Sequence, residues 1–367
     1  MFNRTFEKQI KTIVIVVFWM CLSFAQLGLA QATKRTHFFY SGKSYKTGDT
    51  VFGFKGYVKL LVGDETCPLI LGVPHDGTAK GNPEIPETGT VGRDLNTLAL
   101  ATEIARHFKK KTNLQPWIII NTIARKRVDP NTYPDDLPKR YQDNEARSTY
   151  LSYHALLHAA RAKVSDNLPK EKHALFLDLH GHAHRYVNEQ EYHSIIDGKQ
   201  LTSRFINQIE LGYALSKYAL MQADDYLDKV ADSSSIAALA QQHQEVPFSE
   251  LIRGPYSFGA LLEDEKLPAV PGNKIRKLEY DAAKFGLDQS GLPSSRPYFN
   301  GGYCTRRYGT AKQGQITGFN DRVSSIQAET PGITVRNNKA IIDAASQRFN
   351  RAIIIYLNKW FGYSFRL

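Results

Sequence analysis

Short apolar runs alternate along this chain with longer segments of helical periodicity. The runs at residues 68–73 and 117–123 are almost wholly apolar, which is typical of strands buried on both faces. Between them, residues 95–108 carry apolar side chains at positions 95, 98, 105 and 108, a spacing that predicts one buried helix face. Residues 143–164 are also expected to be helical, and the apolar run at 174–177 follows them as a further strand.

This alternation predicts an α/β fold. We expect three layers (α/β/α), in which helices cover both faces of a central mixed, mostly parallel sheet. Residues 200–250 are expected to be helical, and residues 339–360 predict a long helix that packs on the sheet. The preferred division is a single domain, residues 33–367, with a loop-rich insertion around residues 200–300.

The first 32 residues predict an export signal. Arg4, Lys8 and Lys11 precede an apolar stretch at 13–24, and residues 30–32 (Ala-Gln-Ala) fit a small-x-small cleavage site. An uncleaved membrane anchor is the alternative, but the apolar stretch is short for a bilayer span. We therefore expect a periplasmic or extracellular protein that keeps no stable membrane span after signal cleavage.

The net charge of the chain limits the kinds of partner that it is expected to bind. Removing residues 1–32 takes away three positive charges and Glu7, so the net charge falls from +11 to +9. A positive net charge favours a small acidic or peptide substrate, whereas dispersed basic residues do not predict a nucleic acid partner.

Cys67 and Cys304 could pair in an oxidising compartment or remain two buried thiols. The oligomeric state stays open.

Histidines gather where strands end. Five of the eleven histidines lie between His173 and His193, and three alternate in Asp178-Leu179-His180-Gly181-His182-Ala183-His184, directly after the apolar run at 174–177. The segment Pro74-His75-Asp76-Gly77 follows another apolar run in the same way. Ligands of α/β sheets bind at the carboxyl ends of the strands, and a neutral imidazole is a metal ligand. The pattern therefore predicts the site of a zinc hydrolase.

Several familiar catalytic patterns do not occur in the sequence. It contains no His-Glu-x-x-His, no Gly-x-Ser-x-Gly and no Walker-type phosphate loop. Each of these motifs places its catalytic groups on a particular strand, turn or helix. A helical zincin, a serine hydrolase with a nucleophile elbow and a P-loop enzyme are therefore disfavoured.

Six short motifs follow one another along the chain. They are Pro74-His75-Asp76-Gly77-Thr78, Asp94, Arg127-Val128-Asp129-Pro130-Asn131, Asp178-Leu179-His180-Gly181-His182, the glycine-rich segment at 301–309 and Ile326-Gln327-Ala328-Glu329. In this order they resemble the N-formylglutamate amidohydrolase family, over about residues 68–358. That family is similar in fold to the zinc carboxypeptidases and the aspartoacylase group, so the resemblance implies a carboxypeptidase-like hydrolase.

The resemblance also implies a ligand set for one zinc ion. His75 and His180 match two histidine ligands, and a carboxylate should complete the set with one position open to water. The position three after His75 is Thr78, where the carboxypeptidase pattern has glutamate, so Asp94 is the preferred third ligand and Asp76 the alternative. Glu329 is the candidate general base, because a carboxylate can take a proton from water and return it to an amine.

Arginines are the candidate specificity elements. Arg127 matches the family's arginine, and Asn131 matches a later position of the same segment. Its final arginine is replaced here by Thr132, so Arg306 or Arg125 is expected to compensate. A guanidinium can hold a carboxylate through two parallel hydrogen bonds and can also polarise a carbonyl.

Together these features predict an exported zinc-dependent hydrolase that cleaves an amide bond of an N-acyl amino acid or a carboxylate-bearing peptide. The alternatives are a hydrolase of cell-wall peptides or γ-glutamyl polymers, a non-catalytic envelope binding protein that retains the fold, and a purely structural envelope protein. The expected residues are the catalytic pair Glu329 and Arg127, the substrate-binding residues Arg306, Asn131 and His182, and the metal ligands His75, Asp94 and His180.

Overall fold

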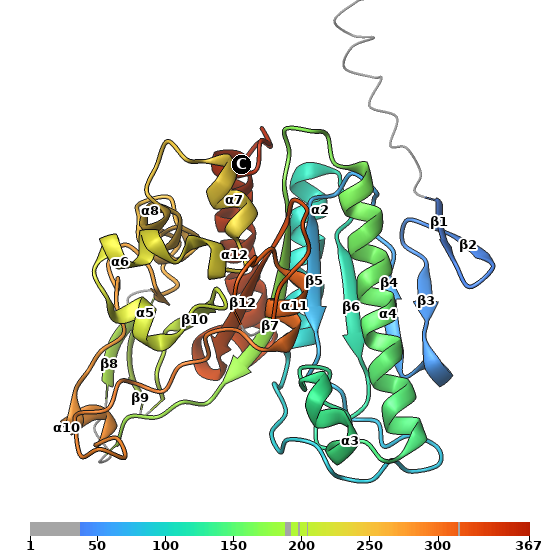
Figure 1. Ribbon diagram of the computed structural model, residues 1–367, viewed down its shortest axis with the longest axis horizontal. Helices are drawn as coiled ribbons and strands as arrows, with labels where there is room; N and C mark the ends of the chain where they lie inside the picture. The colour runs from blue at the N-terminus through green and yellow to red at the C-terminus, as the bar shows by residue number, and fades with distance from the viewer. Residues whose placement is uncertain (1–36, 188–191, 197–198, 204, 315) are drawn as a thin grey trace, which may run out of the picture. The chain divides into compact units, whose positions relative to one another are not determined.

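An eight-stranded sheet organises the described part of the protein (Figure 1). The computed structural model describes residues 37–187, 192–196, 199–203, 205–314 and 316–367. The strand order is β11-β10-β12-β7-β5-β6-β4-β3. The bounds are β3 Thr50–Phe52, β4 Val58–Leu61, β5 Leu69–Val73, β6 Trp117–Asn121, β7 Ala174–His182, β10 Ile209–Gly212, β11 Ala269–Val270 and β12 Val323–Pro331.

The centre of this sheet is parallel and its flanks are partly antiparallel. Strands β12, β7, β5 and β6 pair in parallel, and β11 pairs in parallel with β10. The pairings β10–β12, β6–β4 and β4–β3 are antiparallel. Two hairpins lie outside the sheet, β1 His37–Tyr40 with β2 Lys43–Lys46, and β8 Tyr192–Ile196 with β9 Lys199–Ser203.

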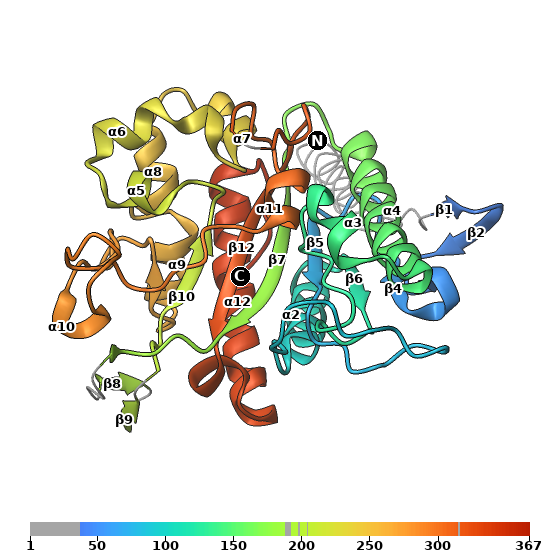
Figure 2. The same ribbon diagram turned by 60° about the horizontal axis from the view of Figure 1, so that its bottom comes forward.

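Helices cover both faces of the sheet (Figures 1 and 2). Helices α2 Thr97–Thr112 and α12 Lys339–Trp360 pack on one face, whereas α4 Asn144–Asn167 and α11 Tyr303–Tyr308 pack on the other. The predicted three-layer α/β/α fold is thus confirmed. The shorter helices are α3 Leu137–Arg140, α5 Lys217–Met221, α6 Asp224–Lys229, α7 Ala237–Gln242, α8 Phe248–Arg253, α9 Phe258–Asp264 and α10 Ala282–Phe285.

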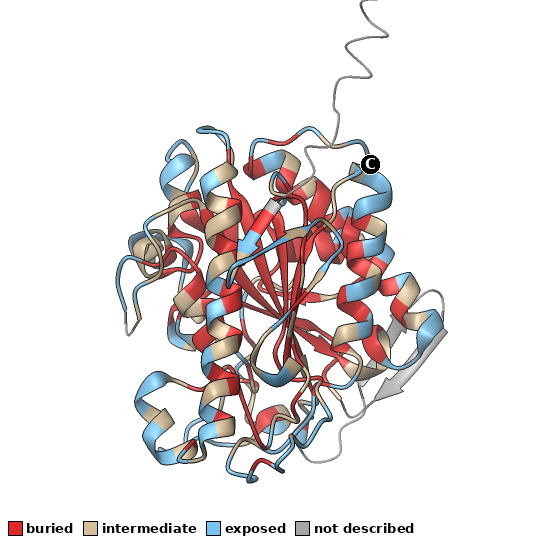
Figure 3. Ribbon diagram, turned by 90° about the vertical axis from the view of Figure 1, so that its right-hand side faces the viewer, coloured by how far each residue is buried: buried red, intermediate tan, exposed pale blue. Residues whose placement is uncertain are grey.

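The central strands have no exposed face. In β7, Leu175, Leu177 and Leu179 face the α2 and α12 layer, whereas Ala174 and Phe176 face the α4 layer. Successive side chains of a strand point to opposite faces, so a strand covered on both sides needs apolar residues at every position. Figure 3 shows the buried strands between helices whose outer surfaces are exposed.

The structure moves the start of one predicted helix. Helix α2 begins at Thr97 rather than at Leu95, because Asn96 has a φ of 66° and the backbone of a left-handed residue cannot continue a helix. Leu95 is consequently 51% exposed, although its spacing had placed it on the buried face. The apolar periodicity identified the helix correctly but placed its start two residues too early.

The region expected to be helical between residues 200 and 250 also contains strands. Strand β10 lies here, and its residue Glu210 pairs with Glu329 of β12. The sequence also gave no indication of the strands before β5. These strands are three or four residues long and mostly not fully apolar, so they lack the periodicity that marked the central strands.

Three further expectations concern membranes and cysteines. The predicted export signal at residues 1–32 lies outside the described residues. Within the described residues, no helix is long and apolar enough to cross a membrane. Cys67 and Cys304 are both buried free thiols, and they belong to the apolar clusters on opposite faces of the sheet. Of the two alternatives left open, the structure therefore shows two buried thiols.

The packing of α12 on the sheet predicts a large effect of truncating its buried face. Phe349→Ala should lower the free energy of unfolding by about 3–5 kcal/mol, since Phe349 is fully buried and its loss leaves a cavity. Gln347→Ala, on the exposed side of the same helix, should change it by about 0.5 kcal/mol or less. Urea unfolding measures both, and equal effects would contradict the packing described here.

Candidate metal centre and active site

The carboxyl ends of the parallel strands meet at one cavity of about 490 Å³. His75 follows β5, Asp129 and Asn131 follow β6, and His180 lies near the end of β7. Glu329 of β12 is the register partner of His180 in the neighbouring strand. Parallel pairing therefore brings residues from four distant segments to a single edge of the sheet.

Three ligand atoms converge beside this cavity. The Nδ1 atoms of His75 and His180 are 3.1 Å apart, and Asp94 Oδ2 lies 3.2 Å from the first and 3.3 Å from the second. All three side chains are buried. Two imidazole nitrogens and one carboxylate oxygen are a donor set that suits zinc. These are the three residues that the sequence analysis named as metal ligands.

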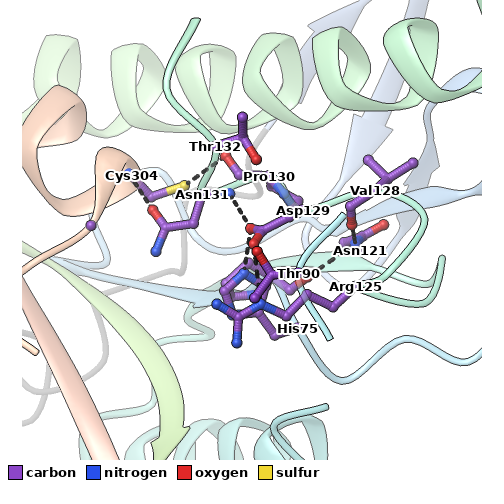
Figure 4. Close-up of polar contacts among 12 residues, drawn as sticks. His75, Thr90, Asn121, Arg125, Val128, Asp129, Pro130, Asn131, Thr132 and Cys304 are labelled. Atoms are coloured by element: carbon purple, nitrogen blue, oxygen red, sulfur yellow. Dashed lines mark hydrogen bonds and ion pairs between the residues drawn. The ribbon is translucent and has the colours of Figure 1, made fainter. Parts of the chain in front are cut away.

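The Nε2 atom of each histidine, on the far side of the ring from Nδ1, contacts a carboxylate. His75 Nε2 lies 2.7 Å from Asp129 Oδ1, and His180 Nε2 lies 3.1 Å from Asp178 Oδ2. The carboxylate of Asp129 contacts both His75 and Arg125 (Figure 4). A histidine that donates its Nε2 proton to a carboxylate presents an unprotonated Nδ1, which is the arrangement of metal-binding histidines. The residues therefore fit a divalent cation.

Charges in this cluster are strongly coupled. Burial by itself raises the pKa of Asp94, but His75 and His180 outweigh it and hold that pKa well below its usual range. Burial lowers the pKa of His180, but Asp178 and Asp94 raise it well above the ordinary value. Without a cation, two neutral Nδ1 lone pairs would face each other beside a carboxylate. The cluster therefore needs a positive charge at its centre, from a proton or from a metal ion.

Asp76, the alternative third ligand, has a different place. Its carboxylate accepts hydrogen bonds from the backbone N–H groups of Asn96 (3.2 Å) and Leu98 (2.9 Å), and it pairs with Arg93 at 2.7 Å. A carboxylate at this position satisfies the free N–H groups of a helix start. Asp76 caps α2, and Asp94 joins the histidines.

Glu329 lines the cavity next to the histidines. Its Oε1 accepts a hydrogen bond from Gln327 (2.8 Å) and lies 3.9 Å from His180 Nδ1. Its Oε2 is buried and has no hydrogen-bond partner among the described residues. Burial raises the pKa of Glu329 to about 8, although the nearby charge of His180 opposes this shift. A buried carboxylate with a raised pKa is suited to accepting and returning a proton.

Two predicted arginines do not line the cavity. Arg127 pairs with Glu84 and Glu87 at 2.5 and 2.7 Å and donates to the carbonyl of Ile85. Arg306 donates to the carbonyl oxygens of Gly301 and Ala214. Both guanidinium groups are used to hold loops. The placement therefore does not support the catalytic role expected for Arg127 or the substrate contact expected for Arg306.

Arg125, the other arginine that the sequence analysis considered, does line the cavity. Its Nη1 lies 3.3 Å from Asp94 Oδ1, and its Nε donates to Asp129 Oδ2 at 3.1 Å. The guanidinium thus bridges a metal ligand and the carboxylate behind His75. This position keeps a positive charge within the cavity and orients both carboxylates.

Asn131 and His182 also line the cavity. The side-chain nitrogen of Asn131 lies 3.5 Å from His180 Nε2. His182 Nε2 donates to the carbonyl of Gln208 at 2.9 Å, and burial lowers the pKa of His182 to about 4, which leaves it neutral. His182 therefore belongs to the cavity wall as an uncharged group.

The described residues contain two other clusters of potential metal ligands. The first consists of His182, His184 and Glu210, and the second of Glu103, His107 and Asp343. In the first, Glu210 is already paired with the buried Arg296 at 2.8 Å, so a cation there would meet a fixed positive charge. In the second, the residues are only half buried and Arg106 pairs with Asp343. The cluster of His75, Asp94 and His180 is fully buried. Arg125 pairs with Oδ1 of Asp94 at 3.3 Å, whereas the other carboxylate oxygen, Oδ2, lies beside the two histidines.

Several residues of the cavity wall were not identified from the sequence, among them Gln327, Phe299 and Arg140. Gln327 donates a hydrogen bond to Glu329. Phe299 is 46% exposed, and the centroid of its ring lies 4.6 Å from that of His184 in a tilted arrangement. Arg140 lines the cavity from the end of α3. Gln327 was part of a quoted motif, and its spacing of two from Glu329 on a strand could have placed both on one face. Nothing in the sequence marked Phe299 or Arg140.

Comparison with known proteins gives a weak likeness to a solved structure. No known protein family matches the sequence, and no curated protein matches it. Among solved structures, the N-formylglutamate amidohydrolase from Ralstonia eutropha JMP134 is similar with a TM-score of 0.41 and 14% identity, over 82% of this chain and 96% of that chain. A likeness at this level identifies neither the family nor the activity of this chain.

The converging ligands predict that metal content depends on two distant histidines. His75→Ala and His180→Ala should each lower the affinity for Zn²⁺ by at least about tenfold, because each removes one of three ligands. His243→Ala, which alters a half-buried histidine outside the cavity, should leave it unchanged. Elemental analysis and competition with a chelator measure this. Retention of one equivalent of metal in both His75→Ala and His180→Ala would contradict the ligand set.

Substitutions of Asp94 and Asp76 should affect different properties of the protein, metal binding and stability respectively. Asp94→Asn should weaken metal binding, whereas Asp76→Asn should retain the metal and lower the free energy of unfolding by about 0.5–2 kcal/mol through loss of the α2 cap. The same metal titration and thermal unfolding distinguish them. The reverse pattern would make Asp76 the ligand.

Proposed function

We propose that this protein is a metal-dependent hydrolase that cleaves an amide bond of an N-acyl amino acid or a carboxylate-bearing peptide. The observation that carries the proposal is the convergence of His75 Nδ1, His180 Nδ1 and Asp94 Oδ2 beside the buried carboxylate of Glu329. Two histidines, one carboxylate and a neighbouring acid are the parts that metal-assisted hydrolysis requires.

Zinc is the cation that this donor set suits best. A divalent ion held there supplies a Lewis acid that polarises a carbonyl and lowers the pKa of water to about 7. His75, His180 and Asp94 would hold it, and the carboxylates of Asp129 and Asp178 keep both imidazoles in the ligating orientation.

Glu329 moves the proton. Its carboxylate takes the proton from the water that attacks the scissile carbonyl and then delivers it to the departing amine. The hydrogen bond from Gln327 fixes one carboxylate oxygen, and the other has no partner among the described residues and remains available to accept a proton. Burial raises the pKa of Glu329, which makes its carboxylate a stronger proton acceptor in the first transfer.

Arg125 takes the part that the sequence analysis gave to Arg127. It is the candidate from that analysis, among Arg125, Arg127 and Arg306, that lines the cavity. A fixed guanidinium near the attacked carbonyl stabilises negative charge as it develops on oxygen. Its ion pairs with Asp94 and Asp129 hold it in place before substrate enters.

The surroundings favour a small substrate. A cavity of about 490 Å³ is within the usual range for small-molecule sites and accommodates an acylated amino acid or the end of a short peptide. Cell-wall peptides and γ-glutamyl polymers are a second candidate class of substrate, because an export signal is predicted and the net charge without it is +9. Both classes contain an amide bond near a carboxylate.

The general-base assignment predicts a separation of metal binding from turnover. Glu329→Gln should lower kcat by at least about 100-fold and retain the bound metal, because the amide cannot accept the proton. Adding Gln327→Glu to the Glu329→Gln protein supplies a carboxylate at a different position and should not restore kcat. Release of amine from a panel of N-acyl amino acids, with metal content determined in parallel, measures the effect.

Three outcomes would contradict parts of the proposal. Unchanged turnover in Glu329→Gln would remove the base assignment. Metal binding with no turnover on acyl amino acids or wall peptides would support a non-catalytic binding protein. A purely structural protein would show neither metal binding nor turnover.

A further inference from the structure

The three arginines that line the cavity differ in how their charge is balanced. Arg93 pairs with Asp76 at 2.7 Å, and Arg125 lies between two carboxylates. Arg140, the last residue of α3, forms no ion pair with any residue in the described part of the chain. It is half buried, so its charge is only partly solvated. The cavity therefore contains one positive charge that the protein itself does not neutralise.

Neutral groups hold this guanidinium in position. Arg140 Nη1 donates to Thr90 Oγ1 at 3.3 Å and to Thr132 Oγ1 at 3.2 Å, and its carbonyl accepts from Thr88 Oγ1 at 2.5 Å. Hydroxyl groups orient the side chain without cancelling its charge. Asp136 lines the same wall, but no ion pair joins it to Arg140. The remaining guanidinium N–H groups have no hydrogen-bond acceptor among the described residues.

One short turn links Arg140 to the metal ligands. In the segment 129–132, Asp129 accepts a hydrogen bond from His75 Nε2, Asn131 approaches His180, and Thr132 contacts Arg140. The turn is closed by the hydrogen bond from Thr132 N to Asp129 O at 3.1 Å. A turn of four consecutive residues thus carries both the contacts to the two histidine ligands and the contact to Arg140.

We propose that Arg140 binds the free carboxylate of the substrate and so fixes which amide bond reaches the metal centre. This inference rests on the proposed function and names the substrate class as acylated amino acids or short peptides with an unblocked carboxylate. A guanidinium forms two parallel, charge-assisted hydrogen bonds with a carboxylate, and a partly desolvated site strengthens them. Arg140 is then a specificity-determining residue for that reaction.

Kinetics on matched substrates test the assignment. The substrates are N-acetyl amino acids with a free carboxylate and the same compounds as primary amides, with acetate release as the readout. Arg140→Gln should raise KM for the free acids about 10- to 100-fold, change kcat little and leave the neutral amides nearly unaffected. Arg140→Lys should recover part of the loss, because an ammonium keeps the charge without the paired geometry.

Arg93→Gln is the matched control, because Arg93 lines the same cavity but is neutralised by Asp76. It should change KM for the free acids by less than about threefold. An equal effect of Arg140→Gln on acids and amides, or no effect on either, would overturn the inference. If Arg140→Gln lowers the melting temperature, the comparison is made with Arg140→Lys, which must still discriminate less between acid and amide than the unaltered protein.

A binding measurement separates failure of this inference from failure of the proposed function. Calorimetric titration of the zinc-loaded Glu329→Gln protein with N-acetylglutamate should give a dissociation constant that rises at least about tenfold when Arg140→Gln is added. Arg140-dependent binding without turnover in the unaltered protein would refute the hydrolase and retain the carboxylate anchor. Turnover that does not change in Arg140→Gln would support the hydrolase and refute the role of Arg140 as carboxylate anchor. Absence of N-acetylglutamate binding at millimolar concentration would also refute that role.

Discussion

The site depends on two buried imidazoles whose Nδ1 atoms lie 3.1 Å apart. Neither histidine can turn away, because Asp129 and Asp178 hold their Nε2 atoms from behind. The protein therefore fixes two lone pairs and the carboxylate of Asp94 around one point, an arrangement that is unfavourable unless a positive charge sits among them. The rest of the candidate chemistry follows from this constraint.

The parallel sheet makes the arrangement possible. Strands β5, β6, β7 and β12 run in the same direction, so residues separated by up to about 250 positions along the chain end at one edge. Apolar layers on both faces keep the strands in register, since a shift of one residue would turn His180 from the Asp178 face to the leucine face of β7. Core packing and metal-ligand geometry are thus coupled.

The sequence identified this architecture and the ligands because both leave local patterns. Continuous apolar runs marked β5, β6 and β7, and His75 and His180 were found because they follow such runs directly. Loop arginines leave no comparable pattern: Arg127 lies in a motif but turns toward Glu84 and Glu87, and Arg140 reaches the cavity from a short helix outside any motif. The direction of a long side chain in a loop is set by tertiary partners, which spacing alone does not reveal.

The most direct test of the central claim is a crystal structure of the purified protein with anomalous scattering recorded at the zinc edge. The account predicts a single strong peak within about 2.0–2.1 Å of Nδ1 of both His75 and His180, with an oxygen of Asp94 as the third protein ligand. A protein that contains zinc elsewhere, or imidazoles that remain hydrogen-bonded to each other in the presence of excess zinc, would contradict it.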